Sequence, residues 1–185
     1  MVSPNEFKKG MKLEIDGAPY NIVEFQHIKP GKGNAFVRTR LKNLFTGKIL
    51  ERNIRTVETY ILANVEEHEM QFMYKDAEGY HFMNNANYEQ VALAADQVGE
   101  TSNYLIENLD CRVLFHNGKA VSVEPPNTIV AEIMETEPGF KGNTATGATK
   151  AAKIATGASV LVPLHLNQGD KIKIDTRSGE YLERM

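Results

Sequence analysis

Short runs of alternating apolar and polar residues, each bounded by turn residues, occupy most of the chain. In the first third, apolar residues recur at every second position, as in Met11, Leu13 and Ile15, and the pairs Asp16-Gly17 and Thr46-Gly47 separate the runs. Alternation with a period of two is typical of strands that bury one face. Because no helical period of useful length occurs between residues 11 and 63, we expect a small β-barrel there.

One hairpin of this barrel has an unusual turn. Residues 21–28 and 35–41 are predicted to be strands, and the segment between them contains Pro30, Gly31, Lys32, Gly33 and Asn34. Proline fixes one φ, while the glycines allow conformations that are closed to other residues. Lys32 is therefore expected at the tip of the hairpin, with no neighbouring side chain to cover it. Such a lysine is either simply solvated or placed to enter a partner.

The middle third predicts two more hairpins and one short helical stretch. Residues 70–83 form an apolar and aromatic hairpin with its turn at residues 76–79, and a second hairpin turns at residues 116–119. Helix is plausible only between residues 88 and 109, where Gly99 would break it in two. About five strands with a short helix indicate an OB-type barrel. The aromatic residues Tyr74, Tyr80 and Phe82 would stack on bases if exposed, but acidic surroundings lead us to expect them in the core.

The pair Pro125-Pro126 marks a domain boundary, because two prolines cannot continue a central strand and favour a stiff extended linker. The remaining residues predict a third β unit without any detectable repeat of the earlier sequence. The expected organisation is mostly all-β, with three small domains. Their boundaries are predicted at residues 1–63, 64–127 and 128–185.

Charge is distributed unevenly over these three segments. Residues 1–63 contain 11 Lys and Arg against 6 Asp and Glu, residues 64–127 contain 3 against 11, and residues 128–185 contain 7 of each. A basic first segment is attracted to phosphate and an acidic middle segment is repelled, so the charge favours docking on RNA in one orientation. In the first segment Arg38, Arg40 and Lys42 alternate on one face of a strand, which is either a phosphate-binding face or a solvated one.

Patterns typical of enzymes and metal sites are missing from the sequence. The segment 142–149 has the two glycines and the threonine of a phosphate-binding loop, but Ala148 stands where that motif requires lysine. The five histidines lack zinc-site spacing, and no serine lies in a nucleophile-elbow pattern. We therefore expect no catalytic residues, no metal and no cofactor.

The compartment follows from cysteine usage and hydropathy. Cys111 is the only cysteine, which excludes an internal disulfide and indicates a reducing compartment. No window approaches eighteen continuous apolar residues, and residues 1–9 have no apolar segment of the kind found in secretory signals. A cytoplasmic protein that does not enter membranes is expected.

Several segments together resemble bacterial translation elongation factor P over essentially the whole chain. Any one of them is weakly specific, and the combination is highly specific. The matching segments are residues 29–33 with 35–38, 41–44 with 46–47, 82–84 with 88–90, 117–118 with 125–126, 137–139 with 141–142, Lys153 and Gly157 with 162–163, and 175–181.

The resemblance implies a fold and a function. Members of this family have an SH3-like (KOW-type) domain followed by two OB-fold domains in an L-shaped, tRNA-like arrangement. They bind both ribosomal subunits between the P and E sites and promote peptide-bond formation when polyproline synthesis stalls, by positioning peptidyl-tRNA. A monomer with no catalytic residues is expected.

The resemblance also implies roles for individual residues of this chain. Lys32 matches the residue that reaches the peptidyl-transferase centre, and in many members a modifying enzyme extends it. Its loop comprises Pro30, Gly31, Gly33 and Asn34, and the expected contacts with tRNA and rRNA are Lys29, Arg38, Arg40 and Lys42. The expected E-site codon loop contains Gly142, Asn143, Thr144 and Gly147, and the expected contacts near the small subunit and the tRNA anticodon stem are Tyr181 and Arg184. Asn143 departs from the acidic residue that is common in that loop.

Two other functions are compatible with the residues alone. One is a generic single-stranded nucleic-acid-binding OB-fold protein, which would require a basic groove with interleaved aromatics in the second or third domain. The charge balance of those two segments counts against it. The other is a small-molecule enzyme whose site is assembled from residues distant in the sequence.

Overall fold

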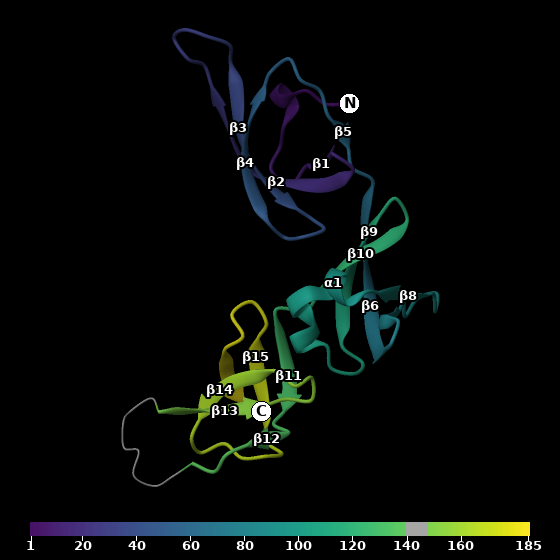
Figure 1. The fold of residues 1–185 in the computed structure, drawn as a ribbon, viewed down its shortest axis with the longest axis vertical. Helices are drawn as coiled ribbons and strands as arrows, with labels where there is room; N and C mark the ends of the chain where they lie inside the picture. Colours follow the sequence, from purple (N-terminus) through teal and green to yellow (C-terminus); the bar gives the residue numbers. More distant parts are fainter. Residues whose placement is uncertain (140–147) are drawn as a thin grey trace. The chain divides into compact units, whose positions relative to one another are not determined.

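The computed structural model describes residues 1–139 and 148–185 and is mostly β, as expected (Figure 1). The chain divides into two compact units, the first formed by residues 1–68 with 114–122 and the second by residues 69–113 with 123–185. None of the helices in the described part of the chain has the length and hydropathy of a membrane-spanning segment.

The first unit is built on a five-stranded antiparallel sheet in the order β4-β3-β2-β1-β5. Its β1–β2 hairpin turns through Asp16 and Gly17, which both have positive φ, the geometry that fits the twist of a two-residue hairpin. The expected barrel is present as a curved sheet, with β4 and β5 as its edges in the described residues. The elements are η1 (Pro4–Glu6), β1 (Lys12–Ile15), β2 (Ala18–Ile28), β3 (Phe36–Asn43), β4 (Ile49–Arg55) and β5 (Ile61–Leu62).

Alternation along the strands builds the core of this unit. In β3, Val37, Thr39 and Leu41 are buried while Arg38 and Arg40 are exposed. Side chains in a strand point alternately to opposite faces, so one strand supplies both an apolar core and a cationic surface. The buried apolar residues are Phe7, Leu13, Ile15, Ile22, Val37, Leu41 and Ile54.

The middle segment forms a second five-stranded sheet, in the order β10-β9-β6-β7-β8. Helix covers only residues 95–104 of the expected range 88–109, because residues 90–93 form a strand. The helical stretch divides at Gly99, whose φ is 58°, so the expected break is confirmed. Cys111 is buried in β9, in agreement with a structural role. The elements are β6 (Val65–Asp76), β7 (Gly79–Met83), β8 (Gln90–Leu93), α1 (Ala95–Val98), η2 (Gly99–Tyr104), β9 (Asp110–His116) and β10 (Lys119–Glu124).

One sequence-based expectation for this segment is wrong. Phe82 and Tyr80 are buried as expected, but Tyr74 is 48% exposed. The pairing of β6 with β7 shifts register between Phe72 and Tyr74, so a β-bulge interrupts the alternation. A bulge of this kind turns the following side chain to the other face of the sheet, which removes Tyr74 from the core.

The C-terminal segment consists of two three-stranded sheets, β11-β15-β16 and β12-β13-β14. They enclose a core of aliphatic residues, against which Tyr104 and Leu109 of the middle segment also pack. The Thr156 hydroxyl donates to the Asn103 carbonyl at 2.7 Å, so the middle and C-terminal segments are bonded within the second unit. The strands are β11 (Thr128–Glu132), β12 (Glu135–Thr136), β13 (Thr149–Lys153), β14 (Ser159–Pro163), β15 (Lys171–Asp175) and β16 (Tyr181–Arg184).

Candidate functional site

The β2–β3 hairpin presents Lys32 at its tip. Regular pairing of the two strands ends at Ile28 opposite Phe36, and residues 29–34 beyond it are all exposed. In Figure 1 this hairpin projects beyond the other strands of its sheet. Within the described residues Lys32 makes no ion pair, so its ammonium group is free to bind an external partner. The predicted position of Lys32 is confirmed.

The two glycines beside Lys32 are not equivalent. Gly33 has φ +108°, a conformation that other residues rarely adopt, and a Cβ placed on it would lie 3.8 Å from Cγ of Pro30. Gly31 has no positive φ, and a Cβ on it would meet nothing within 4 Å. The conformation of the loop therefore requires glycine at position 33. At position 31 glycine only keeps the tip slender, so that the backbone can approach a partner closely.

The cationic face of β3 is present, but carboxylates neutralise part of it. Arg40 lies opposite both Glu24 and Glu51, and its Nη1 is 3.5 Å from Oε2 of Glu24. Arg38 Nε lies 3.6 Å from Oε1 of Glu51. Both arginines remain about half exposed, so these pairs are weak and can exchange for phosphate. The sequence located the cations but missed the acids that face them from the neighbouring strands.

Lys42 has different neighbours in the same sheet. Its cross-strand partners are Asn21 on β2 and Ile49 on β4, neither of which is acidic. Within the described residues Lys42 makes no ion pair, and the same holds for Lys29 at the start of the tip loop. Among the expected RNA contacts, Lys29, Lys32 and Lys42 therefore have no anionic partner within the described residues.

The two C-terminal candidates have structural partners of their own. Tyr181 is half-buried and packs against the C-terminal core, while Arg184 is exposed and its Nη2 lies 3.1 Å from Oδ1 of Asp170. Arg184 also lies in register opposite Ile172 on β15. The expected codon loop, with Gly142, Asn143, Thr144 and Gly147, lies outside the described residues.

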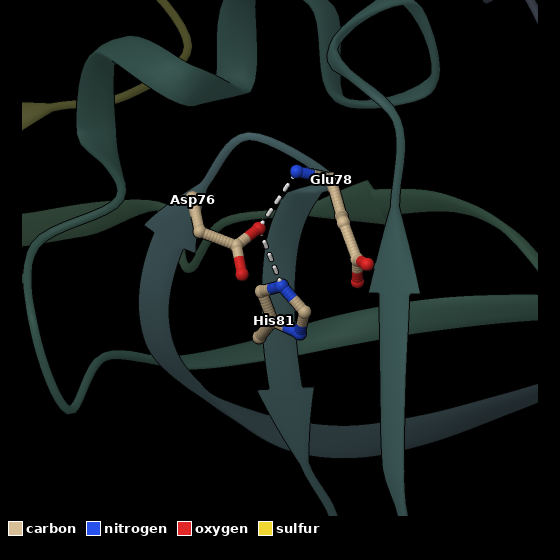
Figure 2. A group of neighbouring side chains, drawn as sticks. All are labelled: Asp76, Glu78 and His81. Carbon is tan, nitrogen blue, oxygen red and sulfur yellow. Dashed lines mark hydrogen bonds and ion pairs between the residues drawn. The ribbon is translucent and has the colours of Figure 1, made fainter.

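A cluster that the sequence pattern did not reveal lies at the β6–β7 turn. Figure 2 shows Asp76 accepting hydrogen bonds from the backbone N–H of Glu78 at 2.9 Å and from His81 Nε2 at 2.8 Å. The His81 bond, followed by the backbone bonds from Glu78 and Gly79, lowers the pKa of the Asp76 carboxyl. One ligand atom from each of Asp76, Glu78 and His81 lies within 4.8 Å of the others, a spacing that would fit a metal ion.

The same contacts have a structural explanation. Asp76 Oδ1 caps the turn by accepting from backbone N–H groups, and His81 stacks on Tyr74 with ring centroids 4.4 Å apart. Side chains that satisfy a tight hairpin in this way are common without any ion. We therefore interpret the cluster as a turn motif that orients His81.

A shallow cavity of about 310 Å³ lies beside β12 and β13. Lys150 Nζ donates to the Glu137 carbonyl at 2.7 Å, and Thr136 Oγ1 donates to the Ala151 carbonyl at 2.9 Å. Those polar groups are used within the fold, and no nucleophile pairs with a base among the residues that line the cavity. The lining residues are Glu135, Thr136, Glu137, Lys150, Ala151, Lys153 and Ser159.

Three family models match consecutive parts of the chain. The elongation factor P KOW-like domain matches residues 3–60, the elongation factor P OB domain matches residues 65–123, and the elongation factor P C-terminal domain matches residues 129–184. Each match lies inside one of the three segments expected from the sequence. The fold implied by the resemblance, a KOW-like domain followed by OB domains, is confirmed.

Curated relatives match along the full length. Proteins named elongation factor P from Caldanaerobacter subterraneus subsp. tengcongensis and Caldicellulosiruptor saccharolyticus are 49% and 50% identical over 185 residues, covering 100% of both chains. The protein of that name from Bdellovibrio bacteriovorus is 48% identical, and the match covers 98% of it.

Solved structures support the fold alone. Eukaryotic translation initiation factor 5A from Methanococcus jannaschii is 21% identical with a TM-score of 0.52, over 67% of this chain and 91% of that one. A translation initiation factor 5A family protein from Naegleria fowleri is 22% identical with a TM-score of 0.50, over 66% and 96%.

Proposed function

The chain belongs to the elongation factor P family and is a translation elongation factor, and on this premise we propose where and how it acts. It binds the ribosome between the P and E sites and promotes peptide-bond formation at polyproline stalls by positioning peptidyl-tRNA. The observation that carries this proposal is the exposed Lys32 at the end of a projecting hairpin. Its slender, glycine-flanked loop suits entry into a narrow site made of RNA.

Positioning is sufficient to explain the proposed activity. Proline is a poor nucleophile, and a misaligned peptidyl-tRNA end slows the reaction that the ribosome itself performs. Holding reacting groups in a productive geometry lowers the barrier, and each tenfold in rate requires only about 1.4 kcal/mol. The factor then contributes no acid or base of its own, consistent with a family of translation factors that is not regarded as enzymatic.

Lys32 supplies the contact with the peptidyl-tRNA end in this proposal. A lysine ammonium group has three donors and no acceptor, so it pairs with phosphate or base oxygens. A lysine-modifying enzyme would extend this reach by adding an amine-bearing arm to Nζ. The exposure of residues 29–34 leaves the side chain accessible to such an enzyme.

The other expected contacts complete the proposed interface. Lys29, Arg38, Arg40 and Lys42 contact tRNA and rRNA phosphates near the tip. The segment with Gly142, Asn143, Thr144 and Gly147 approaches the E-site codon, and Tyr181 and Arg184 lie near the small subunit and the anticodon stem. The three domains at residues 1–63, 64–127 and 128–185 carry these contacts as a cytoplasmic monomer.

A generic single-stranded nucleic-acid binder is less well supported. Base stacking needs exposed aromatics along a basic groove, and two of the three aromatics considered for it, Tyr80 and Phe82, are buried. The third, Tyr74, lies beside Asp76 and its turn. The middle segment therefore does not offer the expected stacking surface.

The test compares wild-type protein with Lys32→Ala in a strain that lacks the factor, using a polyproline reporter and a reporter without prolines. The variant should melt normally, since an exposed tip has little to pack against and such changes usually fall within about 0.5 kcal/mol, yet fail to restore the polyproline reporter. Lys8→Ala, at another exposed lysine of the first unit, is the matched control. Equal rescue by Lys32→Ala would refute the proposal. Intact mass spectrometry of native protein then tests whether Lys32 is modified.

A further inference from the structure

The tip of the β9–β10 hairpin carries a buried histidine, which pairs with a partly exposed glutamate on β1, and the proposed function uses neither group. His116 is only 8% exposed, and its Nε2–H donates to Glu14 on β1, at 2.8 Å to Oε2 and 3.1 Å to Oε1. An ionised carboxylate can only accept, so the imidazole is the donor. The two residues are 102 positions apart in the chain, yet residues 114–122 belong to the same compact unit as Glu14.

Two further contacts involve the same tip. The Asn117 N–H donates to the Asn64 carbonyl at 3.0 Å, and the Phe45 ring meets the His116 ring edge-on, with centroids 5.4 Å apart. Phe45 lies in the turn after β3, where its own N–H donates to Asn43 Oδ1 at 2.8 Å. The hairpin tip is therefore bonded to β1 and packed against the turn that ends β3.

We propose that His116 and Glu14 form a latch that fastens the β9–β10 hairpin tip to the first sheet and, through Phe45, steadies the turn at the end of β3. β3 is the strand whose other end begins at the Lys32 loop. Removing Glu14 leaves the N–H of the buried His116 ring without its acceptor, which is unfavourable, and removing His116 takes away the group that holds the partly exposed Glu14 in place. The tip therefore has a closed state, seen here, and an open state in which both groups are hydrated.

The latch is a property of the first unit and does not rest on the proposed ribosomal function. It predicts that closure is cooperative between the two side chains, because either substitution alone abolishes the same bond. It also predicts that opening is local. The Asn117 amide, bonded to Asn64, reports the hairpin tip, and the Gly47 amide, bonded to the Asn43 carbonyl at 2.7 Å, reports the turn after β3.

Hydrogen exchange of the full chain tests the latch in wild type, His116→Ala, Glu14→Ala and the double variant. Each single variant should speed exchange at Asn117 about tenfold or more, with a smaller acceleration at Gly47. The double variant should exchange no faster than the faster single variant, since interacting residues are not additive. Lys119→Ala, an exposed change at the same tip, and Glu24→Ala, which removes a carboxylate paired elsewhere in the sheet, should leave Asn117 unchanged.

Two results would overturn the proposal. One is additive acceleration in the double variant, and the other is unchanged exchange at Asn117 in both single variants. If an alanine variant unfolds globally, Glu14→Gln remains informative, because the glutamine keeps an oxygen that accepts from His116 and removes only the charge. It should accelerate exchange at Asn117 less than alanine does, with the core strands unchanged. Equal acceleration at Asn117 and in the core strands would mean that the pair does not hold the tip as a local closure.

Discussion

Glu24 lies directly opposite Arg40 across β2 and β3, and its Oε2 accepts a hydrogen bond from Nη1 of Arg40 at 3.5 Å. Glu51 lies opposite Arg40 on the other side and contacts Arg38. The face that is expected to meet RNA therefore consists of arginines that already have anionic partners and lysines that do not. Phosphate would have to displace a carboxylate to reach Arg38 or Arg40, whereas Lys42 has none to lose.

This difference predicts unequal salt dependence for ribosome binding. A substitution that removes one phosphate-binding cation should lower the log-log slope of affinity against salt by about 0.7 to 0.9. Lys42→Gln should show this full change, and Arg40→Gln a smaller one, because Arg40 is already paired with Glu24 and contributes less to phosphate binding. The measurement is a binding titration at several salt concentrations.

Two glutamate variants provide the control. Glu24→Gln and Glu51→Gln should strengthen binding at low salt, because each removes a competitor of phosphate. If all four substitutions left both the affinity and the slope unchanged, the face would be merely solvated.

The tip loop makes a second prediction through its two glycines. Gly33→Ala forces a side chain into φ +108° and should distort the loop at a cost of about 1 kcal/mol or more, while Gly31→Ala meets no neighbour and should melt within about 0.5 kcal/mol of wild type. Polyproline rescue should fall for Gly33→Ala even where the fold survives, since Lys32 would no longer be presented in the same direction. The two variants are matched in size and charge, so their difference reports conformation. Equal melting and equal rescue would show that the conformation at position 33 is unimportant.

Most of the fold could be predicted from the sequence because local signals determine it. The alternation of Arg38 and Arg40 with Val37 and Leu41 located the faces of β3, and Gly99 located the break in the helical stretch. Tyr74 was misplaced because a bulge at the preceding residues changes the face without a clear signature in the residues themselves.

The features of the site that the sequence could not provide depend on partners from distant segments. The fold brings Glu14 next to His116, and strand register brings Arg38 next to Glu51. Neither pair is close in the sequence. The Asp76 and His81 pair is local, and the hairpin turn between two predicted strands was the available signal. Alternation places residues on a face, but it does not identify which opposite charge will stand next to them.

Gly79, which begins β7, makes a third prediction about stability. Its φ is +140°, and a Cβ on it would collide with the Leu93 carbonyl. Gly157 also has positive φ, at +87°, but a Cβ there would meet nothing within 4 Å. Gly79→Ala should therefore cost well over the roughly 1 to 3 kcal/mol expected for backbone strain alone, while Gly157→Ala should stay within that range. Urea unfolding of both variants measures the difference, and similar midpoints would show that β8 can move away from position 79.

Cys111 makes the last prediction, through the dependence of stability on alkaline pH. Burial, with a smaller contribution from the nearby Asp110 charge, raises the pKa of its thiol from 9.0 to about 12. When a group has a higher pKa in the folded state, its contribution to the free energy of unfolding is full at pH values where the group is protonated in both states. That contribution is lost as the pH rises above the unfolded pKa toward the folded pKa. Between about pH 9 and 11 the free energy of unfolding should fall by up to about 1 kcal/mol per pH unit because of this thiol.

The comparison is urea unfolding of wild type and Cys111→Ala across this range, since alanine keeps the site apolar and removes the titration. The tyrosines and lysines titrate in both proteins and cancel. The variant should start less stable, because a buried side chain has been shortened, and its curve should be flatter above about pH 9. Parallel curves would mean that the thiol reaches water in the folded state, and a thiol reagent at about pH 8 should then modify it rapidly without denaturant.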